Sequence, residues 1–447
     1  MPLAGLPIGK RSALLLDKEN MTKYSISPMS SLYELYLRHP RISTDSRRIE
    51  PDSVFFALRG ASFDGNRFAA DALEKGAAYA VVDDPSLPNT RPDKADRLIV
   101  VDDALQTLQT LAREHRRELG LPILAITGSN GKTTTKELVS RVLAEKYEVY
   151  ATRGNLNNHI GVPLTLLAMT RDVEFGIVEM GASACGEIAL LCSIAEPNYG
   201  IVTNIGRAHL EGFGGPEGVR RGKGELYDWL ARTGGRVFVP ANDPVLMSMA
   251  AERETLAAEC YPTTLADGVE HHLEGDYNRF NVAAAVAVGR YFGVDDERIR
   301  YAEGSYRPDN HRSQKIRTGQ NTLILDCYNA NPSSMQASLV NFRQEPLEGC
   351  TRKILILGDM LELGDWSDAE HRHIISLAAE IPDARILLVG PHFEMAFRSR
   401  DSRPADTTLY PSQEVLAAEL RKHPVSQALI LVKGSHSIGL ERLADLL

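Results

Sequence analysis

The sequence has little of what membrane and secreted proteins contain. Its 447 residues are 43% hydrophobic, 24% charged and 6% aromatic, which is ordinary for a soluble globular protein and excludes a collagen-like, wholly disordered or coiled-coil chain. No apolar run approaches the ~18 to 20 residues that a membrane-spanning helix needs. Near the N-terminus, the apolar run 13–16 ends at Asp17, whereas the core of a secretory signal is about twice as long or more. We therefore expect a cytoplasmic protein with no membrane span.

Paired cysteines and clustered positive charge are also lacking. The five cysteines are an odd number, lie far apart and include no Cys-x-x-Cys pair, which argues against a disulfide framework and a structural zinc site. Acidic residues number 59 against 50 basic ones, and the net charge is -9. Because binding to nucleic acid depends on clustered Lys and Arg, we expect no nucleic-acid partner.

The length and the order of the apolar segments predict an α/β protein of three domains. A chain of 447 residues corresponds to about three domains of ~150 residues each. Strand-like runs alternate with helix-like ones, which is typical of parallel sheets covered by helices. Pro122 ahead of a new strand, and the polar segment 306–312, divide the chain into domains 1–118, 119–310 and 311–447. We expect a parallel sheet of the phosphate-loop ATPase type in the central domain and a Rossmann-like doubly wound sheet in the last.

The expected strands are short apolar runs bounded by polar or turn residues. A helix with Leu105, Leu108 and Leu111 at three-residue spacing is expected to close the first domain. The predicted strands are 54–58, 80–82 and 98–101 in the first domain, 123–127, 175–179, 199–203 and 236–240 in the second, and 322–326, 353–357, 385–389 and 428–432 in the third.

The most specific local pattern is a glycine-rich turn between a predicted strand and a predicted helix. Residues 128–135, Gly-Ser-Asn-Gly-Lys-Thr-Thr-Thr, directly follow the strand 123–127. In such a loop, backbone amides converge on phosphate oxygens, Lys132 reaches the β- and γ-phosphates, and Thr133 holds Mg²⁺. The candidate ATP-binding residues are Gly128, Ser129, Asn130, Gly131, Lys132, Thr133 and Thr134. The alternative interpretation is a glycine turn that only caps a helix.

The loop is two residues shorter than the common G-x-x-x-x-G-K-[ST] pattern. In this it resembles the ATP loop of the Mur ligases and folylpolyglutamate synthetases, which use ATP to join an amine to a carboxylate. The segments 154–164, 326–332, 357–364 and 432–435 are similar to the MurF type of Mur ligase, and the Asp-Asn-Pro-Arg motif of the MurE type is absent. The resemblance extends in order over about residues 40–447.

The resemblance implies a metal site. Glu179 ends the predicted strand 175–179, at the edge where open α/β sheets place ligands, and matches the family's Mg²⁺ glutamate. His209 matches its second-metal histidine, and Lys223 matches the lysine that Mur ligases carry as a carbamate. With Thr133, these residues form the implied metal-ligand set. Taken alone, they would more often be an ion-pair partner, a surface histidine and a solvated helix lysine.

Other matches imply contacts with the nucleotide. Asn278 and Asn281 align with asparagines on the adenine side, although Tyr277 stands where histidine is common. An asparagine N-cap on an alanine-rich helix is the alternative explanation, and both can hold. Arg312 keeps a positive charge for phosphate, and Asp326 begins a loop that, in the family, closes over nucleotide and peptide.

The remaining matches imply contacts with the other substrates. In the N-terminal domain, the segments 44–47, 55–60 and 64–66 look like UDP-binding elements of the MurE and MurF types. His371 is either near the dipeptide or structural, and His436 replaces a common arginine. The implied substrate contacts are Ser46, Arg47, Asp64, Gly65, Asn155, Asn157, Asn158, Tyr328 and Asn329.

The implied activity is that of an ATP-dependent amide ligase with Lys132, Glu179, His209 and Lys223 as its catalytic group. The carboxylate of UDP-MurNAc-tripeptide is expected to attack the γ-phosphate of ATP, and the amine of D-alanyl-D-alanine then attacks the acyl phosphate. We expect a monomer whose domains close on binding. Three alternatives remain open: a ligase of the MurE or folylpolyglutamate synthetase type, a regulatory NTPase switch, and an inactive UDP-sugar-binding protein.

Overall fold

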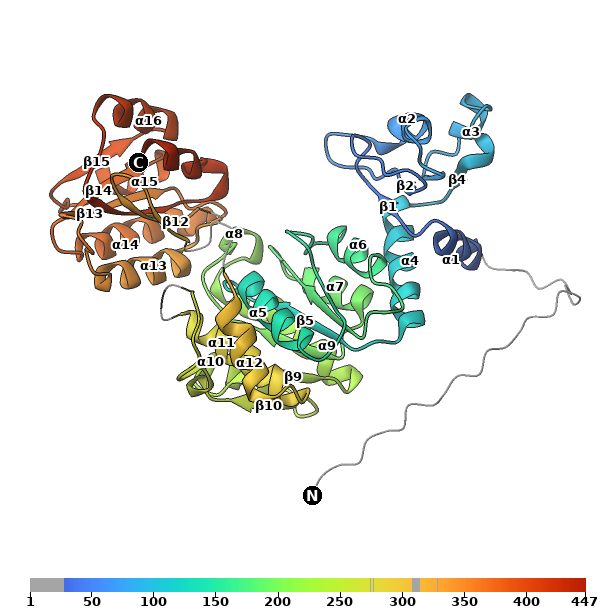
Figure 1. Ribbon diagram of the computed structural model, residues 1–447. Helices are drawn as coiled ribbons and strands as arrows, with labels where there is room; N and C mark the ends of the chain where they lie inside the picture. Colours follow the sequence, from blue (N-terminus) through green and yellow to red (C-terminus); the bar gives the residue numbers. More distant parts are fainter. Residues whose placement is uncertain (1–27, 274, 276, 308–313, 328) are drawn as a thin grey trace, which may run out of the picture.

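The computed structural model forms three α/β units, each built around its own sheet (Figure 1). It describes residues 28–273, 275, 277–307, 314–327 and 329–447. Two residues expected in the site, Arg312 and Tyr328, lie outside the described residues. In Figure 1 the N-terminal and C-terminal units flank the central one. Strands and helices alternate along all three units, which confirms the expected α/β class.

The N-terminal unit is a four-stranded parallel sheet in the order β1-β2-β3-β4. Its strands are β1 (Ile42–Ser43), β2 (Val54–Phe56), β3 (Tyr79–Val82) and β4 (Leu98–Val100), and its helices are α1 (Pro28–Arg38), α2 (Ala69–Glu74), α3 (Leu87–Thr90) and α4 (Ala104–Leu119). Strands β2, β3 and β4 confirm the three predicted from the sequence; β2 and β4 are shorter than predicted and β3 begins one residue earlier. The strand β1 was missed because two residues give no detectable pattern.

The central unit is a six-stranded, all-parallel sheet in the order β10-β9-β8-β5-β7-β6. Its strands are β5 (Ile123–Thr127), β6 (Val149–Ala151), β7 (Phe175–Glu179), β8 (Tyr199–Val202), β9 (Arg236–Pro240) and β10 (Ala257–Tyr261). Its helices are α5 (Lys132–Ala144), α6 (Gly161–Leu167), α7 (Glu187–Ala195), α8 (Leu210–Phe213), α9 (Pro216–Thr233), α10 (Pro244–Ala251), α11 (Asn278–Tyr291) and α12 (Asp296–Ser305).

Helices cover both faces of the central sheet, as the continuous apolar strands predict. Along β5, Ile123 and Ala125 belong to the hydrophobic core that contains α7 and α9, whereas Leu124 and Ile126 belong to the core with α5 and α11. All four side chains are fully buried. This double cover leaves the carboxyl edge of the sheet as the place where loops can bind a ligand.

Helix α4 of the N-terminal unit also packs against the central unit, because one hydrophobic core contains its leucines, Phe56 of β2 and residues of α6 and α7. Leu108 and Leu111 are fully buried in the core shared with α6 and α7. The His115 ring is 2.8 Å from the Met169 carbonyl oxygen, and Arg116 donates from Nε to the Ala195 carbonyl oxygen at 2.9 Å. The chain therefore passes to the second sheet after α4, and α4 itself packs on both units.

The C-terminal unit is a doubly wound sheet in the order β11-β12-β16-β13-β14-β15. Only the edge strand β11 is antiparallel to its neighbour. The strands are β11 (Gln314–Arg317), β12 (Thr322–Asp326), β13 (Arg352–Gly358), β14 (Ala384–Val389), β15 (Thr407–Tyr410) and β16 (Ala428–Lys433), and the helices are α13 (Pro332–Gln344), α14 (Ser367–Ala379), α15 (Pro391–Arg398) and α16 (Gln413–Lys422).

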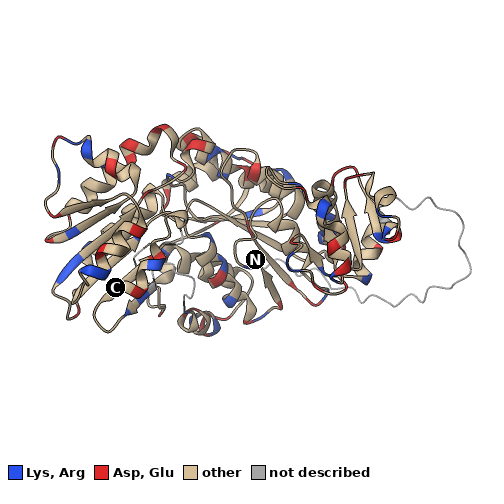
Figure 2. Cartoon of the chain, turned by 90° about the horizontal axis from the view of Figure 1, so that it is seen from above, with Lys and Arg blue, Asp and Glu red and all other residues tan. Residues whose placement is uncertain are grey.

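Charged residues are mixed over the described chain. Figure 2 shows Lys and Arg interspersed with Asp and Glu on all three units. Among the described residues, no helix is both long and apolar enough to span a bilayer.

Glu303 on α12 is a carboxyl group buried without a partner. It is fully buried, and neither of its oxygens has a hydrogen-bond partner among the described residues. Burial raises the pKa of Glu303 from its ordinary 4.5 to about 8. Between these values the folded protein keeps a proton that the unfolded chain releases, so stability is full below the lower pKa and is lost as pH rises to the higher one, by up to about 1.4 kcal/mol per pH unit.

We expect Glu303→Gln to remove this loss of stability. The free energy of unfolding, measured by urea denaturation at several pH values between about 5 and 8, should fall less steeply in the variant than in the wild type. Glu297→Gln changes an exposed carboxyl of the same helix and is the matched control. Parallel pH dependences for the wild type and Glu303→Gln would contradict the assignment.

Candidate active site

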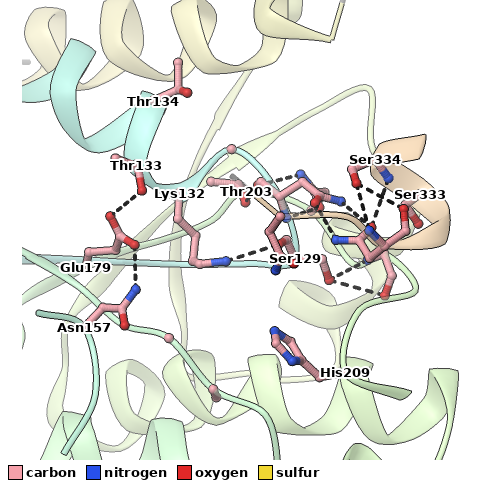
Figure 3. Close-up of a pocket in the computed structure, with 18 of the residues that line it drawn as sticks. Ser129, Lys132, Thr133, Thr134, Asn157, Glu179, Thr203, His209, Ser333 and Ser334 are labelled. Carbon is pink, nitrogen blue, oxygen red and sulfur yellow. Dashed lines mark hydrogen bonds between the residues drawn. The ribbon is translucent and has the colours of Figure 1, made fainter. Parts of the chain in front are cut away.

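A cavity of about 970 Å³ lies between the central and C-terminal units (Figure 3). The phosphate loop and the ends of β7 and β8 line it from the central unit, and the N-terminus of α13 lines it from the C-terminal unit. Of the residues predicted for the site, the structure brings together in its lining Ser129, Asn130, Gly131, Lys132, Thr133, Thr134, Asn155, Asn157, Asn158, Glu179, His209, Asn278, Asn281, Asp326 and Asn329.

The phosphate loop joins β5 to α5, which begins at Lys132. A side chain at Gly128, whose φ is 139°, would place Cβ 2.0 Å from Thr203 Oγ1. This close approach requires glycine. Lys132 folds back over the loop and donates from Nζ to the carbonyl oxygens of Gly128 at 2.7 Å and Ser129 at 3.1 Å. A phosphate at the start of α5 would meet the backbone amides of the helix N-terminus.

The loop between β8 and α8, residues 203–209, holds the phosphate loop in place. Asn204 accepts from the Asn130 amide at 3.1 Å and donates to the Asn130 carbonyl oxygen at 3.0 Å. The hydroxyl of Thr203 donates to the same carbonyl oxygen at 2.5 Å. Sequence reasoning missed Thr203 and Asn204, and the only available signal was their position after a predicted strand.

Glu179 is held in a buried network of polar side chains. It is 2% exposed at the end of β7. Thr133 Oγ1 donates to Glu179 Oε2 at 2.9 Å and Asn157 Nδ2 donates to Oε1 at 2.8 Å, as Figure 3 shows. Lys136, which the prediction omitted, lies on the next turn of α5 with Nζ 3.9 Å from Oε2. The carboxylate is therefore fixed beside the phosphate loop.

Thr133 and Glu179 fit a bound Mg²⁺. Their oxygens are the hard ligands that Mg²⁺ prefers, and Mg²⁺ is usually bound through one or two protein groups together with phosphates and waters. Among the described residues there is no group of three or more His, Cys, Asp or Glu side chains placed to hold a metal. The described residues therefore do not form a metal site made of protein ligands alone.

His209 lines the same cavity but has a partner from the C-terminal unit. Its ring pairs with Glu362, which was not predicted as a site residue. Burial lowers the pKa of His209, and Glu362 opposes that shift. His209 has a φ of 53° and Glu362 a φ of 61°, so two residues in the left-handed region face each other across the interface. Such backbone is retained where the surrounding contacts require it.

Lys223 is buried on α9 and does not line the cavity. It is 2% exposed, and its Nζ donates to the Ala182 carbonyl oxygen at 3.0 Å. Burial, and next the positive charge of Lys132, lowers the pKa of Lys223 to about 7. A large fraction of this amine is therefore uncharged near neutral pH, which is unusual for lysine.

Asn278 and Asn281 brace the start of α5 from α11. Asn281 Oδ1 accepts from the Thr135 hydroxyl at 3.0 Å, and Asn281 Nδ2 donates to Asn278 Oδ1 at 2.8 Å. A Cβ at Gly131 would lie 2.7 Å from Asn281 Oδ1. The asparagines thus have a structural role in addition to their place in the cavity lining.

The C-terminal unit meets the phosphate loop through the start of α13. Asn331 donates to Asn130 Oδ1 at 2.8 Å, and its own Oδ1 accepts from the Ser334 amide at 2.9 Å. Deeper in the cavity, Lys433 is 1% exposed and pairs with Asp326. The nucleotide site and the C-terminal unit are therefore in direct contact.

Family models match most of the chain in three segments. Residues 40–116 match the Mur ligase family catalytic domain, residues 126–264 the Mur ligase middle domain, and residues 311–436 the Mur ligase glutamate ligase domain. The UDP-N-acetylmuramoyl-tripeptide--D-alanyl-D-alanine ligase of Bacillus subtilis is 34% identical over 441 residues, covering 90% of this chain and 92% of the relative. The chain belongs to the Mur ligase family. The ligase of the same name from Escherichia coli is 31% identical, covering 90% of this chain and 92% of the relative.

Solved structures of Mur ligases are also similar over nearly the whole length. MurF from Acinetobacter baumannii matches with a TM-score of 0.79 and 30% identity, over 91% of this chain and 93% of that one. The MurF ligase from Thermotoga maritima in complex with ADP matches with a TM-score of 0.77 and 25% identity, over 92% of this chain and 97% of that one. The three-unit architecture of this Mur ligase is therefore that of its solved relatives.

The N-terminal residues expected to bind UDP do not line the cavity of this Mur ligase. Arg47 pairs with the neighbouring Asp45 at 2.8 Å, and Ser46 accepts from Lys75 through its carbonyl oxygen. Asp64 accepts from the Asn66 amide at 3.0 Å and caps a short helix. At Gly65 a Cβ would lie 2.4 Å from the Leu58 carbonyl oxygen, so glycine is required there for packing.

Two further sequence expectations prove to have local structural roles. Asn158 Oδ1 accepts from the Ile160 amide at 3.1 Å and from the Gly161 amide at 2.9 Å, in the turn that precedes α6. His371 is fully buried and accepts from the Met360 amide at 3.1 Å, and it does not line the cavity. Of the two explanations left open for His371, the structural one fits its position.

Proposed function

We propose that this Mur ligase joins D-alanyl-D-alanine to UDP-MurNAc-tripeptide in an ATP-dependent reaction that gives UDP-MurNAc-pentapeptide for peptidoglycan. The observation that supports it most is the phosphate loop with Thr133 and Glu179, facing the C-terminal unit across one cavity. Two relatives, of which this chain covers 92% of the length, are UDP-N-acetylmuramoyl-tripeptide--D-alanyl-D-alanine ligases. A cavity with this lining would hold the nucleotide and a second substrate together.

The chemistry requires activation because a carboxylate is a poor electrophile. One carboxylate oxygen of the tripeptide attacks the γ-phosphorus of ATP, the bond to the β-phosphate oxygen breaks, and ADP leaves. The amine of the dipeptide then attacks the carbonyl carbon, the C–O bond to phosphate breaks, and the amine loses a proton. Lys132, at the start of α5, is placed to stabilise charge on the transferring phosphoryl group.

Thr133 and Glu179 are the residues that would hold Mg²⁺, which neutralises phosphate charge during such a transfer. Asn157 and Thr133 already orient the carboxylate through both of its oxygens. His209 and Lys223 complete the proposed catalytic group as expected from the family motif. A second-metal role for His209 would require its ring to exchange Glu362 for the ion.

We further propose that Lys223 is carbamylated. Its uncharged Nζ would attack CO₂, an N–C bond would form, and one proton would leave the nitrogen. The near-neutral pKa of about 7 supports this because a charged ammonium is not a nucleophile. The carbamate would place an anionic oxygen group at the end of the Lys223 side chain, in place of the amine.

Lys223→Arg is expected to lower kcat for ligation by about a hundredfold, because arginine stays charged and does not take up CO₂. Carbon-13 NMR of enzyme in labelled bicarbonate should show a carbamate signal that the variant lacks. Lys223→Gln tests whether the bulk of arginine causes the loss, and circular dichroism checks the fold. Full activity in both variants, or a carbamate signal that persists, would contradict the proposal.

The N-terminal unit is proposed to bind the UDP end through Ser46, Arg47, Asp64 and Gly65, with Asn155, Asn157, Asn158 and Asn329 nearer the reacting end. Arg312 and Tyr328 keep the nucleotide and peptide roles expected from their motifs. The domain limits 1–118, 119–310 and 311–447, the monomeric state and the cytoplasmic location are likewise proposals. The mixed surface charge in Figure 2 supports small-molecule substrates in place of nucleic acid.

The direct test is phosphate release from ATP with UDP-MurNAc-tripeptide, with and without D-alanyl-D-alanine, together with the product mass. Phosphate release and a UDP-MurNAc-pentapeptide mass only when both are present would support the proposal. Release without the dipeptide would point to an NTPase switch. No turnover with both would favour another amine or acceptor within the Mur ligase family.

A further inference from the structure

Arg207 is the residue of the β8–α8 loop that bonds to two helices of the C-terminal unit. Its backbone amide donates to the Ser333 hydroxyl at 2.8 Å, at the start of α13. Its Nη1 donates to Glu370 Oε1 at 2.6 Å, on α14. The Arg207 side chain is 55% exposed and that of Glu370 is 6% exposed. Arg207 does not line the cavity, so it has no direct contact with a substrate there.

Gly206, the residue before Arg207 in the β8–α8 loop, is hydrogen-bonded to the phosphate loop. The Gly206 amide donates to the Ser129 hydroxyl at 2.8 Å, and that hydroxyl donates to the Gly206 carbonyl oxygen at 3.2 Å. A Cβ at Gly206 would lie 2.9 Å from Ser333 Oγ and 3.1 Å from Ser129 Cβ. Gly206 is therefore enclosed between the phosphate loop and α13, and both contact it directly.

The Glu370 carboxylate depends on Arg207 for its charge balance. Its second oxygen, Oε2, is buried and has no hydrogen-bond partner among the described residues. Removing Arg207 would leave a buried anion without its cation, which costs more than losing an exposed pair. The apolar part of the interface would persist, because Leu210 and Phe213 pack into the core of the C-terminal unit. The interface thus combines apolar packing with one ion pair whose carboxylate is buried.

We propose that Arg207 is a positioning residue for the second half of the reaction. Through Glu370 it holds the C-terminal unit at the angle that presents the dipeptide amine to the acyl group activated at the phosphate loop. This inference rests on the proposed ligase function. It assigns the role to an ion pair outside the cavity, which the family motifs used in the sequence analysis did not include.

Steady-state kinetics of Arg207→Ala, Glu370→Gln and the double variant test the proposal. Arg207→Ala is expected to raise KM for D-alanyl-D-alanine about tenfold, because the buried carboxylate loses its partner. The affinity for ATP should change less than about twofold, since Asn204 and Thr203 hold the phosphate loop without the Arg207 side chain. The double variant should be no worse than Arg207→Ala, because the two residues act as one unit.

Two variants separate positioning from general instability. Arg207→Lys keeps the charge and should restore most of the affinity for the dipeptide. Arg372→Ala removes an arginine on α14, the helix of Glu370, that pairs with Asp368 on that same helix, and it should leave KM unchanged. Equal changes in ATP affinity and dipeptide KM, multiplicative losses in the double variant, or an effect of Arg372→Ala as large as that of Arg207→Ala would each overturn the proposal.

A measurement without turnover distinguishes this proposal from the proposed function. Small-angle X-ray scattering with a non-hydrolysable ATP analogue should give a larger radius of gyration for Arg207→Ala than for the wild type. Identical scattering curves would overturn the positioning role. If the wild type ligates no dipeptide while the scattering difference appears, the ligase assignment fails and the docking role of Arg207 stands.

Discussion

Lys132→Ala is expected to lower kcat for ATP-dependent ligation by about a thousandfold or more, because the phosphoryl group loses its nearest fixed cation. Lys132 begins α5 and folds over the loop onto Gly128 and Ser129. Among the described lining residues, the other lysine is Lys433, which is already paired with Asp326. Nothing else on that lining supplies an equivalent charge at the phosphate loop. Phosphate release measured at saturating substrates checks the result.

Lys146→Ala is the matched control for Lys132→Ala. Lys146 lies just beyond the other end of α5, where its Nζ donates to the carbonyl oxygens of Phe292 and Gly293 at 2.9 Å. Its removal should leave kcat within about twofold of the wild type, since surface substitutions have small effects. Ligation by Lys132→Ala at a tenth of the wild-type rate or more, with an intact fold, would contradict the proposed transfer step.

Glu179→Gln is expected to lower kcat by about a hundredfold to a thousandfold and to raise the Mg²⁺ concentration needed for half-maximal rate. Glutamine keeps the length of the side chain but removes the negative charge that a hard cation requires. The buried position adds a second cost, because Thr133 and Asn157 both donate to the carboxylate, and an amide accepts through one oxygen only. Rate measurements over a range of Mg²⁺ concentrations test both effects.

Glu174→Gln serves as the control for Glu179→Gln. Glu174 lies one residue before β7, is exposed, and accepts from the Glu148 amide at 2.9 Å. It should leave the Mg²⁺ dependence unchanged because the two ends of a strand face different edges of the sheet. An unchanged Mg²⁺ dependence in Glu179→Gln would show that Glu179 holds no metal.

The sequence predicted the buried strands of the fold well and the edge strands poorly. Strands β5, β7, β9 and β12 have the predicted bounds, because they are continuous apolar runs buried on both faces. The edge strands β1, β10 and β11 were missed, and so were the edge strands β6 and β15. The last two have three and four residues, most of them half-buried, so neither length nor periodicity marks them.

For the site, local sequence identified what one element supplies and missed what two units share. The phosphate loop and Glu179 follow strands directly, so motif and position were enough to propose them. Asn331 and Asn130 are 201 residues apart, and Glu362 and His209 are 153 apart. Such contacts depend on how the units dock, which no local pattern encodes. The buried state of Lys223, and with it the low pKa, likewise depends on tertiary packing.

The packing of α4 onto α6 and α7 bears on how the units of this family can be exchanged. The chain passes from the first sheet to the second near residue 119. Before that point, Leu108 and Leu111 of α4 already pack in the core with α6 and α7, and His115 bonds to Met169. A chimera joined after α4 would bring a foreign helix onto that core, with every mismatched side chain creating a void or a clash. A junction placed before Ala104 keeps α4 together with α6 and α7. Recombination between Mur ligases should therefore be tolerated at a junction before Ala104 and should destabilise the protein at a junction after α4.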